Sequence, residues 1–185
     1  IADNIMVLYV CDNGWIQRPD SSGYAERSKR TPYDGGIRTP IMVKWPGHVT
    51  PGMDKTTLVN SIDLAPTILD ACDMNPTDKM EGLSLLDSKA LKKRDAVFGA
   101  AYTHDAVDIE KPISSLKYTY VIEGEWKLIL PSGRNDTGKN PELYHITEDP
   151  YEKNNLASSN TGKVEHLKQL ITNWRSEAVL PVKQK

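Results

Sequence analysis

Apolar residues in the first half of the chain gather into two short runs with the character of strands. Ile5–Val10 is apolar without interruption, which predicts a buried strand of the kind found in the middle of a parallel sheet. A second strand is predicted at Ile41–Trp45, where the turn-forming pair Pro46-Gly47 closes the run. Between the two runs, residues 12–36 form a long polar stretch. A stretch of that length without structure of its own is uncommon in a compact domain unless it is functional.

A helix is predicted over residues 61–72, because the apolar residues there return to one face at helical spacing. That face contains Ile62, Ala65, Leu69 and Cys72. Ser61 or Asp63 is expected to cap the helix, and Pro66 falls near the first turn, where a missing N–H costs little.

The second half of the chain has a different pattern, in which strand-like runs follow one another closely. These runs occupy residues 96–102, 116–124, 125–131 and 142–146. Glu123-Gly124-Glu125 is expected to form a hairpin turn. An amphipathic helix is then predicted from Lys163 to Ala178, since Val164, Leu167, Ile171, Trp174 and Ala178 recur at helical spacing. We expect this helix to cover one face of an antiparallel sheet.

These patterns predict an α/β fold with two regions. Residues 1–94 are expected to contain part of a parallel sheet. Residues 95–185 are expected to form a small antiparallel sheet covered by the C-terminal helix. The first strand needs buried neighbours on both sides, and the chain offers few other strands of that kind. We therefore expect the chain to be the C-terminal part of a longer polypeptide.

The composition is that of an ordinary globular protein, with 38% hydrophobic and 26% charged residues among 185. The net charge of −2, with acids and bases interspersed, gives no basic surface for a nucleic acid or an anionic membrane. No apolar run reaches the roughly 18–20 residues that a transmembrane helix needs. Cys11 and Cys72 are expected to be free, buried thiols, which leaves the redox compartment open.

The first strand ends abruptly in Asp12-Asn13-Gly14. These residue types are common in turns, and an ordinary turn is one interpretation. The other is a cation site, because a carboxylate and an amide oxygen are suitable ligands for Ca²⁺ or Mg²⁺. Open α/β sheets also place their sites beyond the carboxyl ends of strands. The tripeptide alone leaves both interpretations open.

A second dense motif is SKRTPYDGGIRTPIMVKWPG, residues 28–47. Lys29 is a compact cation suited to an oxyanion, although Lys29 and Arg30 also fit a solvated charged pair. Gly35-Gly36 lets the backbone approach another group closely, although it also fits an ordinary turn. The density of the motif favours a site.

Four blocks together resemble the C-terminal half of a type I sulfatase, the formylglycine-dependent branch of the alkaline phosphatase superfamily. The blocks are VLYVCDNGW, SKRTPYDGGIRTPIMVKWPG, SIDLAPTILDAC and ELYHITEDPYEKNNLA, in the family's order between residues 4 and 178. The resemblance implies an alkaline-phosphatase-like fold and hydrolysis of sulfate esters, with sulfated glycans as the expected substrates. It also favours a periplasmic or secreted protein.

The resemblance implies roles for individual residues. Asp12 and Asn13 match the family's ligands of the active-site calcium. Lys29 matches the lysine that contacts the sulfate, five positions before the acid of the Tyr-Asp-Gly-Gly motif. The turn beneath the site would then be built by Asp34, Gly35, Gly36 and Arg38.

Two further residues have more than one interpretation. His104 follows a predicted strand and is either a structural or surface group or, as the resemblance suggests, a substrate-binding contact in the pocket. Trp15 directly follows the proposed metal ligands, and it either stacks on a sugar or aryl ring or packs internally.

The chain lacks the other parts of such a site. It contains neither an aspartate pair to complete the calcium site nor the C/S-x-P/A-x-R motif whose Cys or Ser becomes formylglycine. We expect both in a missing N-terminal part of the same polypeptide, so the chain alone is expected to be inactive and to bind calcium weakly. The alternatives are a phosphoesterase or phosphonate hydrolase of the same superfamily, and a non-catalytic structural or binding module.

Overall fold

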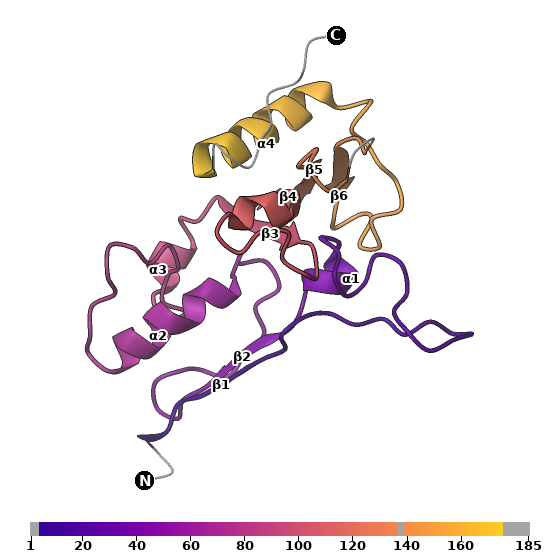
Figure 1. The fold of residues 1–185 in the computed structure, drawn as a ribbon. Helices are drawn as coiled ribbons and strands as arrows, with labels where there is room; N and C mark the ends of the chain where they lie inside the picture. The colour runs from indigo at the N-terminus through magenta and orange to yellow at the C-terminus, as the bar shows by residue number, and fades with distance from the viewer. Residues whose placement is uncertain (1–3, 137–138, 176–185) are drawn as a thin grey trace. The chain divides into compact units, whose positions relative to one another are not determined.

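The computed structural model describes residues 4–136 and 139–175, and the chain divides into two compact units. The first unit contains the residues up to Asp12 together with Thr39–Val97. The second contains Asn13–Arg38 together with the described residues from Phe98 onward. The long polar stretch therefore packs with the C-terminal sheet rather than with the strands that flank it in sequence (Figure 1).

The first unit contains a two-stranded sheet made of β1 (Val7–Val10) and β2 (Ile41–Lys44). The pairing is antiparallel, with Val10 opposite Ile41. This corrects the expectation of a parallel sheet, because among the described strands β1 pairs with β2 alone. The expected burial is also wrong for this chain, since Val7 and Tyr9 are about half exposed.

The predicted helix is present as a 3₁₀ turn, η2 (Ser61–Asp63), that continues into α2 (Leu64–Ala71). The N-cap residue is Asn60, and the predicted Asp63 takes part in the cap as the second residue of a capping box. The Asn60 side chain accepts from Ser61 N–H, while the Asp63 carboxylate accepts from Asn60 N–H. Asp63 is fully buried, and Arg94 donates two hydrogen bonds to it, at 2.6 and 2.7 Å.

The buried face of α2 differs from the predicted one. Ile62 and Ile68 are 51% and 48% exposed, whereas Pro66 and Thr67 are buried. Thr67 is tolerated there because its hydroxyl donates to Asp63 O at 2.6 Å and accepts from Leu85 N–H at 2.8 Å. Hydrogen bonding rather than apolar periodicity therefore selects the inward face. The unit's remaining helix is α3 (Ser88–Leu91).

The second unit is built on a four-stranded sheet in the order β3-β4-β5-β6. Its strands are β3 (Ala96–Tyr102), β4 (Leu116–Glu123), β5 (Trp126–Pro131) and β6 (Glu142–His145), with η3 (Pro112–Ser115) leading into β4. The pairings β4–β5 and β5–β6 are antiparallel. The predicted hairpin is confirmed: Glu123 pairs with Trp126, and Gly124 turns the chain with a φ of 55°.

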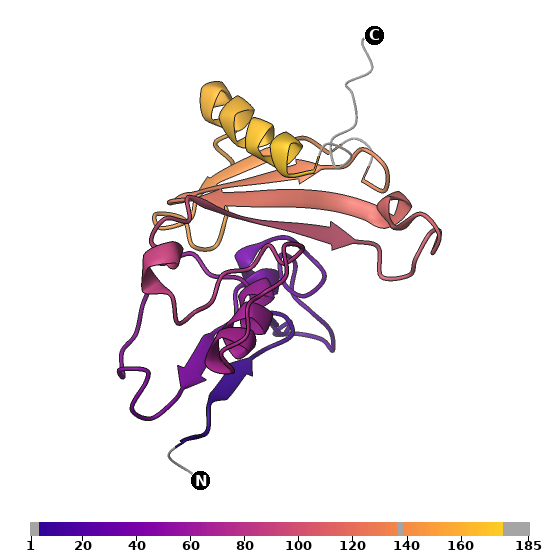
Figure 2. The same cartoon turned by 90° about the vertical axis from the view of Figure 1, so that its left-hand side faces the viewer.

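Helix α4 (Thr161–Trp174) lies along one face of this sheet (Figure 2). Val164, Leu167 and Ile171 are its buried residues, which confirms the predicted apolar stripe. The predicted end at Ala178 lies outside the described residues. Within the described ranges, every helix is too short or too polar to cross a lipid bilayer.

A buried cluster of charges joins the sheet to the short helix α1 (Asp34–Ile37). Lys127 of β5 is fully buried, and its ammonium lies 2.8 Å from Asp34 Oδ1 and 2.7 Å from Glu152 Oε1. Asp34 N–H donates to the other Glu152 oxygen at 2.6 Å. Burial raises the pKa of Glu152, and the Lys127 charge opposes that rise. Three separate segments are thus fixed by one ammonium group.

The two thiols are free, as expected, but neither is fully buried. Cys11 is half-buried and Cys72 is exposed. Cys72 is the C-cap residue of α2. The burial expected for these thiols is therefore wrong.

We predict that Lys127→Met strongly destabilises the protein. Methionine is also long and unbranched, but it removes the buried ammonium that Asp34 and Glu152 share. Breaking a buried ion pair in this way costs about 3–5 kcal/mol of unfolding free energy. The measurement is the urea midpoint followed by circular dichroism. The control is Lys168→Met, which removes a surface pair with Glu165 at 3.6 Å and should cost under about 0.5 kcal/mol. Similar shifts for both variants would contradict the prediction.

Candidate functional site

Three glycines allow the backbone at Gly14 to pack against the turn formed by α1, within the second unit. Gly14 N–H donates to Gly36 O at 2.8 Å. A Cβ on Gly14 would lie 2.4 Å from Gly35 O, and one on Gly36 would lie 2.3 Å from Ser28 O. Such contacts exclude any side chain, so these positions require glycine for close backbone approach. The sequence Asp12-Asn13-Gly14 is therefore more than a surface turn, because its glycine is packed against the second motif.

Asp12 and Asn13 stand where the chain passes from the first unit to the second. Asp12 is exposed, and Asn13 is half-buried with its amide N–H donating to Gly14 O at 2.9 Å. That bond uses one of the two N–H groups of the amide. A carboxylate and an amide oxygen form a donor set that fits Ca²⁺. The described residues contain no group of three or more His, Cys, Asp or Glu suited to a metal, so further ligands would have to come from elsewhere.

The segment that carries Lys29 is held by its own backbone. Ser28 is fully buried, and its hydroxyl oxygen accepts from Ile16 N–H at 2.5 Å. Arg27 and Arg30, on either side, adopt left-handed backbone conformations with φ of 57° and 68°. Non-glycine residues adopt such conformations at a cost and persist in them only where the surroundings enforce them. The position of Lys29 is therefore set by a strained and tightly bonded turn.

Arg27 attaches this turn to the sheet. Its guanidinium lies 4.8 Å from the centroid of the Tyr33 ring and 5.9 Å from that of Tyr144. Both phenols donate to the carboxylate of Glu142 at the start of β6. Burial, followed by these hydrogen bonds, raises the pKa of both tyrosines above the ordinary value. The phenols remain protonated donors at neutral pH, and the turn stays anchored.

Lys29 lies beside a pair of aromatic rings. Its ammonium is 5.4 Å from the centroid of the Trp15 ring and 5.8 Å from that of Tyr24, and the two rings meet edge to face with centroids 4.6 Å apart. Gln17 and Tyr24 form a bridge, so the loop that carries these rings folds back as a small hairpin. Among the ion pairs of the described residues, none includes Lys29. Its ammonium contacts the two rings.

His104 joins the same cluster through Arg30. The guanidinium Nη2 of Arg30 donates to His104 Nε2 over 3.2 Å, and its Cζ lies 5.7 Å from the centroid of the Tyr24 ring. His104 also lines a hollow of about 350 Å³ between the end of β3 and η3, together with Tyr102, Thr103, Ala106, Asp108, Ile109, Pro112 and Ser115. The structure thus brings Lys29 and His104 to either side of Arg30.

Sequence reasoning missed Tyr24 and treated Arg30 as half of a solvated pair. The available signal was the alternation of aromatic and basic residues between Trp15 and Arg30. That signal is weak, because only the hairpin and the distant His104 bring these side chains together. We call Trp15, Tyr24, Lys29, Arg30 and His104 the basic-aromatic cluster.

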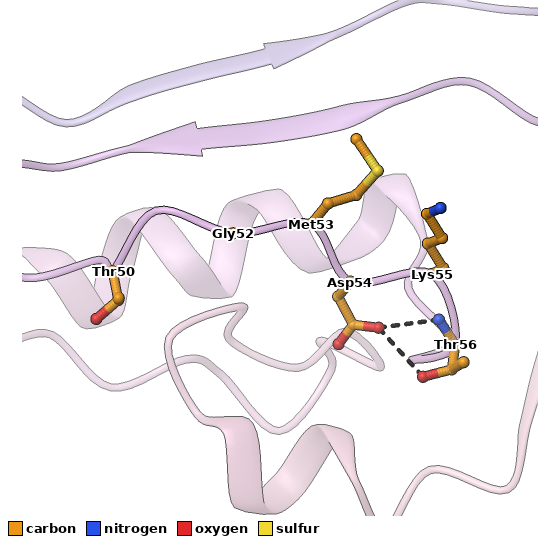
Figure 3. A pocket seen from close by; sticks show the side chains of 6 residues that line it. All are labelled: Thr50, Gly52, Met53, Asp54, Lys55 and Thr56. Atoms are coloured by element: carbon orange, nitrogen blue, oxygen red, sulfur yellow. Dashed lines mark hydrogen bonds between the residues drawn. The ribbon is translucent and has the colours of Figure 1, made fainter.

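A larger hollow, of about 640 Å³, lies in the first unit along residues 50–56 (Figure 3). Asp54 is its only acid, and the carboxylate accepts from the N–H and hydroxyl groups of Thr56 and Thr57. These bonds, with Thr57 foremost, lower the pKa of Asp54 below its usual range. The carboxylate serves the loop's own turn, so the basic-aromatic cluster is the stronger candidate.

The chain is similar to known sulfatases in sequence and fold. The family described as N-sulphoglucosamine sulphohydrolase, C-terminal, matches residues 23–177. A sulfatase of Formosa agariphila is 29% identical over 171 residues, which cover 86% of this chain and 30% of that protein. An N-acetylgalactosamine-6-O-sulfatase of Bacteroides thetaiotaomicron is 24% identical over 205 residues, covering 92% of this chain and 36% of that protein.

A solved structure gives the same result for the fold. A protein in complex with its substrate D-glucosamine-2-N,6-O-disulfate superposes with a TM-score of 0.67 at 23% identity, covering 95% of this chain and 35% of that one. The chain thus spans about a third of the length of these relatives. Because the family model covers most of the sequence, the chain belongs to the N-sulphoglucosamine sulphohydrolase C-terminal family, which confirms its resemblance to sulfatases.

Proposed function

We propose that this chain acts as the C-terminal part of a sulfatase that hydrolyses sulfate esters of glycans. The observation that carries the proposal is Lys29, a cation without a carboxylate partner among the described residues, held beside two aromatic rings. Relatives include an N-acetylgalactosamine-6-O-sulfatase and a protein bound to a disulfated glucosamine. Aromatic rings suit the apolar face of a sugar, and the ammonium suits its sulfate.

Lys29 supplies fixed positive charge where the ester reacts. As the bond between sulfur and the leaving oxygen breaks, negative charge grows on that oxygen and on the sulfuryl oxygens. A preorganised ammonium stabilises that charge more than it stabilises the ground state, and this difference lowers the barrier. The strained turn around Ser28 keeps Lys29 in place, so little reorganisation is needed during the reaction.

Asp12 and Asn13 are the residues that would hold calcium. When bound, the ion would neutralise charge on the sulfuryl oxygens and act as a Lewis acid. Asn13 would contribute its amide oxygen, while its nitrogen donates to Gly14 O. This chain covers about a third of the length of its relatives. The remaining ligands and the formylglycine nucleophile would belong to the other part of the enzyme.

The related alternative is hydrolysis of phosphate esters, since the superfamily shares this arrangement of metal and cation. The names of the relatives favour sulfate. The deciding experiment compares kcat/KM for matched sulfate and phosphate esters with the protein encoded by the natural reading frame. A higher kcat/KM for the phosphate ester would show that the protein is a phosphoesterase and would overturn the proposal.

We predict that the 185-residue chain alone does not hydrolyse an aryl sulfate. It lacks the nucleophile motif, and two oxygen donors fall far short of the roughly 6–8 that calcium takes. The assay measures release of the aryl alcohol with added calcium, beside the protein from the natural reading frame. Turnover by the chain at a similar rate would show that its own residues contain a complete site.

Lys29→Ala in the natural protein should lower kcat/KM by about 10²–10³, the usual effect of removing one group that stabilises developing charge. The control is Lys79→Ala, which removes an exposed lysine from a loop of the first unit. Circular dichroism checks that both variants are folded. A loss below tenfold for Lys29→Ala would argue against direct contact with the sulfate.

Asp12→Ala should raise the calcium concentration for half-maximal activity by at least about tenfold, because the variant loses a charged ligand. Calorimetric titration of calcium should show the same loss of affinity. Asp20→Ala, which removes an exposed acid from the adjacent loop, is the control. Equal calcium affinity in Asp12→Ala and the parent would rule out Asp12 as a ligand.

A further inference from the structure

A second cation of the basic-aromatic cluster, Arg30, has no role in the function proposed above. Its guanidinium donates to His104 Nε2 over 3.2 Å. A guanidinium can only donate, so Nε2 is the accepting nitrogen in this contact. The second contact is the Tyr24 ring, 5.7 Å away. These contacts fix the position of the arginine head and leave its charge uncompensated.

Several cations of the second unit are paired with carboxylates, unlike these two. Arg38 and Lys127 lie within ion-pair distance of Asp34, and Lys163 pairs with Glu123. None of the ion pairs among the described residues includes Arg30 or Lys29. Arg30 also keeps a left-handed backbone, with a φ of 68°. Strain of this kind concentrates where a side chain must be presented in one direction.

The spacing of the two cations fits one short glycan. The Lys29 ammonium and the Arg30 Cζ lie 5.8 and 5.7 Å from the same Tyr24 ring. Their separation therefore cannot exceed the sum of those distances, which is about the length of a disaccharide. The planar fork of arginine binds sulfate or carboxylate with two parallel hydrogen bonds, whereas lysine acts as a point charge.

We propose that Arg30, positioned by His104, binds a second anionic group of the glycan whose sulfate ester lies against Lys29. The group is a sulfate or a carboxylate on the same or the adjacent sugar. The inference rests on the proposed sulfatase function and narrows the substrate class to glycans with at least two anionic groups. Arg30 then acts on specificity, and His104 is a positioning residue.

The test uses the protein from the natural reading frame and three probes. Glucosamine 6-sulfate has one anionic group, glucosamine 2-N,6-O-disulfate has a second sulfate, and a uronate joined to glucosamine 6-sulfate has a carboxylate. The parent should prefer one or both of the dianionic probes. Arg30→Ala should lower that preference about tenfold through KM, with little change in the ratio of kcat values. If Arg30→Ala loses the preference for only one of the two dianionic probes, that probe identifies the second anionic group.

Two further variants separate positioning from general charge. His104→Ala should lower the preference in the same direction, and His104→Gln should restore much of it, because the amide oxygen can accept the Arg30 hydrogen bond. If His104 had only a structural role, His104→Ala would change kcat/KM for all three probes to the same extent. Lys153→Ala removes one positive charge from an exposed lysine of the second unit, and it should leave the preference as it is.

The outcomes distinguish this proposal from the one it rests on. A parent that hydrolyses all three probes without preference, or an Arg30→Ala variant that slows all three equally, overturns the role of Arg30 and leaves the sulfatase function standing. No turnover of any probe counts against the sulfatase function. In that case, calorimetric titration with the probes tests the role of Arg30. If the parent binds a dianionic probe more tightly than glucosamine 6-sulfate and Arg30→Ala abolishes the difference, the role is supported. If the parent binds all three probes equally, the role is overturned.

Discussion

The ammonium group of Lys127 is the constraint on which the second unit depends. A fully buried ammonium is tolerated only if carboxylates replace its lost hydration, and the two that do so belong to distant segments. Asp34 begins α1, and Glu152 lies in the loop between β6 and α4. The backbone of Asp34 also donates to Glu152, so the turn is held by main chain and side chain together. The Tyr-Asp-Gly-Gly motif thus attaches a loop to the four-stranded sheet.

The attachment of α1 to the sheet also determines where residues of the basic-aromatic cluster lie. Next to Asp34, Gly35 and Gly36 admit the carbonyl oxygens of Arg27 and Ser28 at distances that no side chain would allow. Arg27 packs over the tyrosines that bond to Glu142, which fixes the other end of the turn. The segment between these two supports has little conformational freedom left. Lys29 and Arg30 are therefore presented by a rigid turn, although they lie in a long polar stretch.

The sequence predicted the elements of the second unit well because their signals are local. The hairpin at Gly124 and the stripe of α4 depend on neighbours within a few residues. The errors fall where distant partners decide. The antiparallel pairing of β1 needs β2, thirty-odd residues away, and the inward face of α2 is selected by the bond from Leu85 N–H to the Thr67 hydroxyl. Periodicity contains no information about either contact.

The candidate site divides in the same way. Lys29 was found because a motif surrounds it, whereas Arg30 gains its significance from His104, far along the chain. Lysine and arginine are not interchangeable in such a pair. The compact charge of lysine suits an oxyanion whose charge changes during the reaction. The broad fork of arginine suits a group whose charge stays constant. In the function that we propose, a lysine beside two rings and an arginine that donates to His104 would therefore divide the work, one acting on the ester that reacts and the other on the group that identifies the substrate.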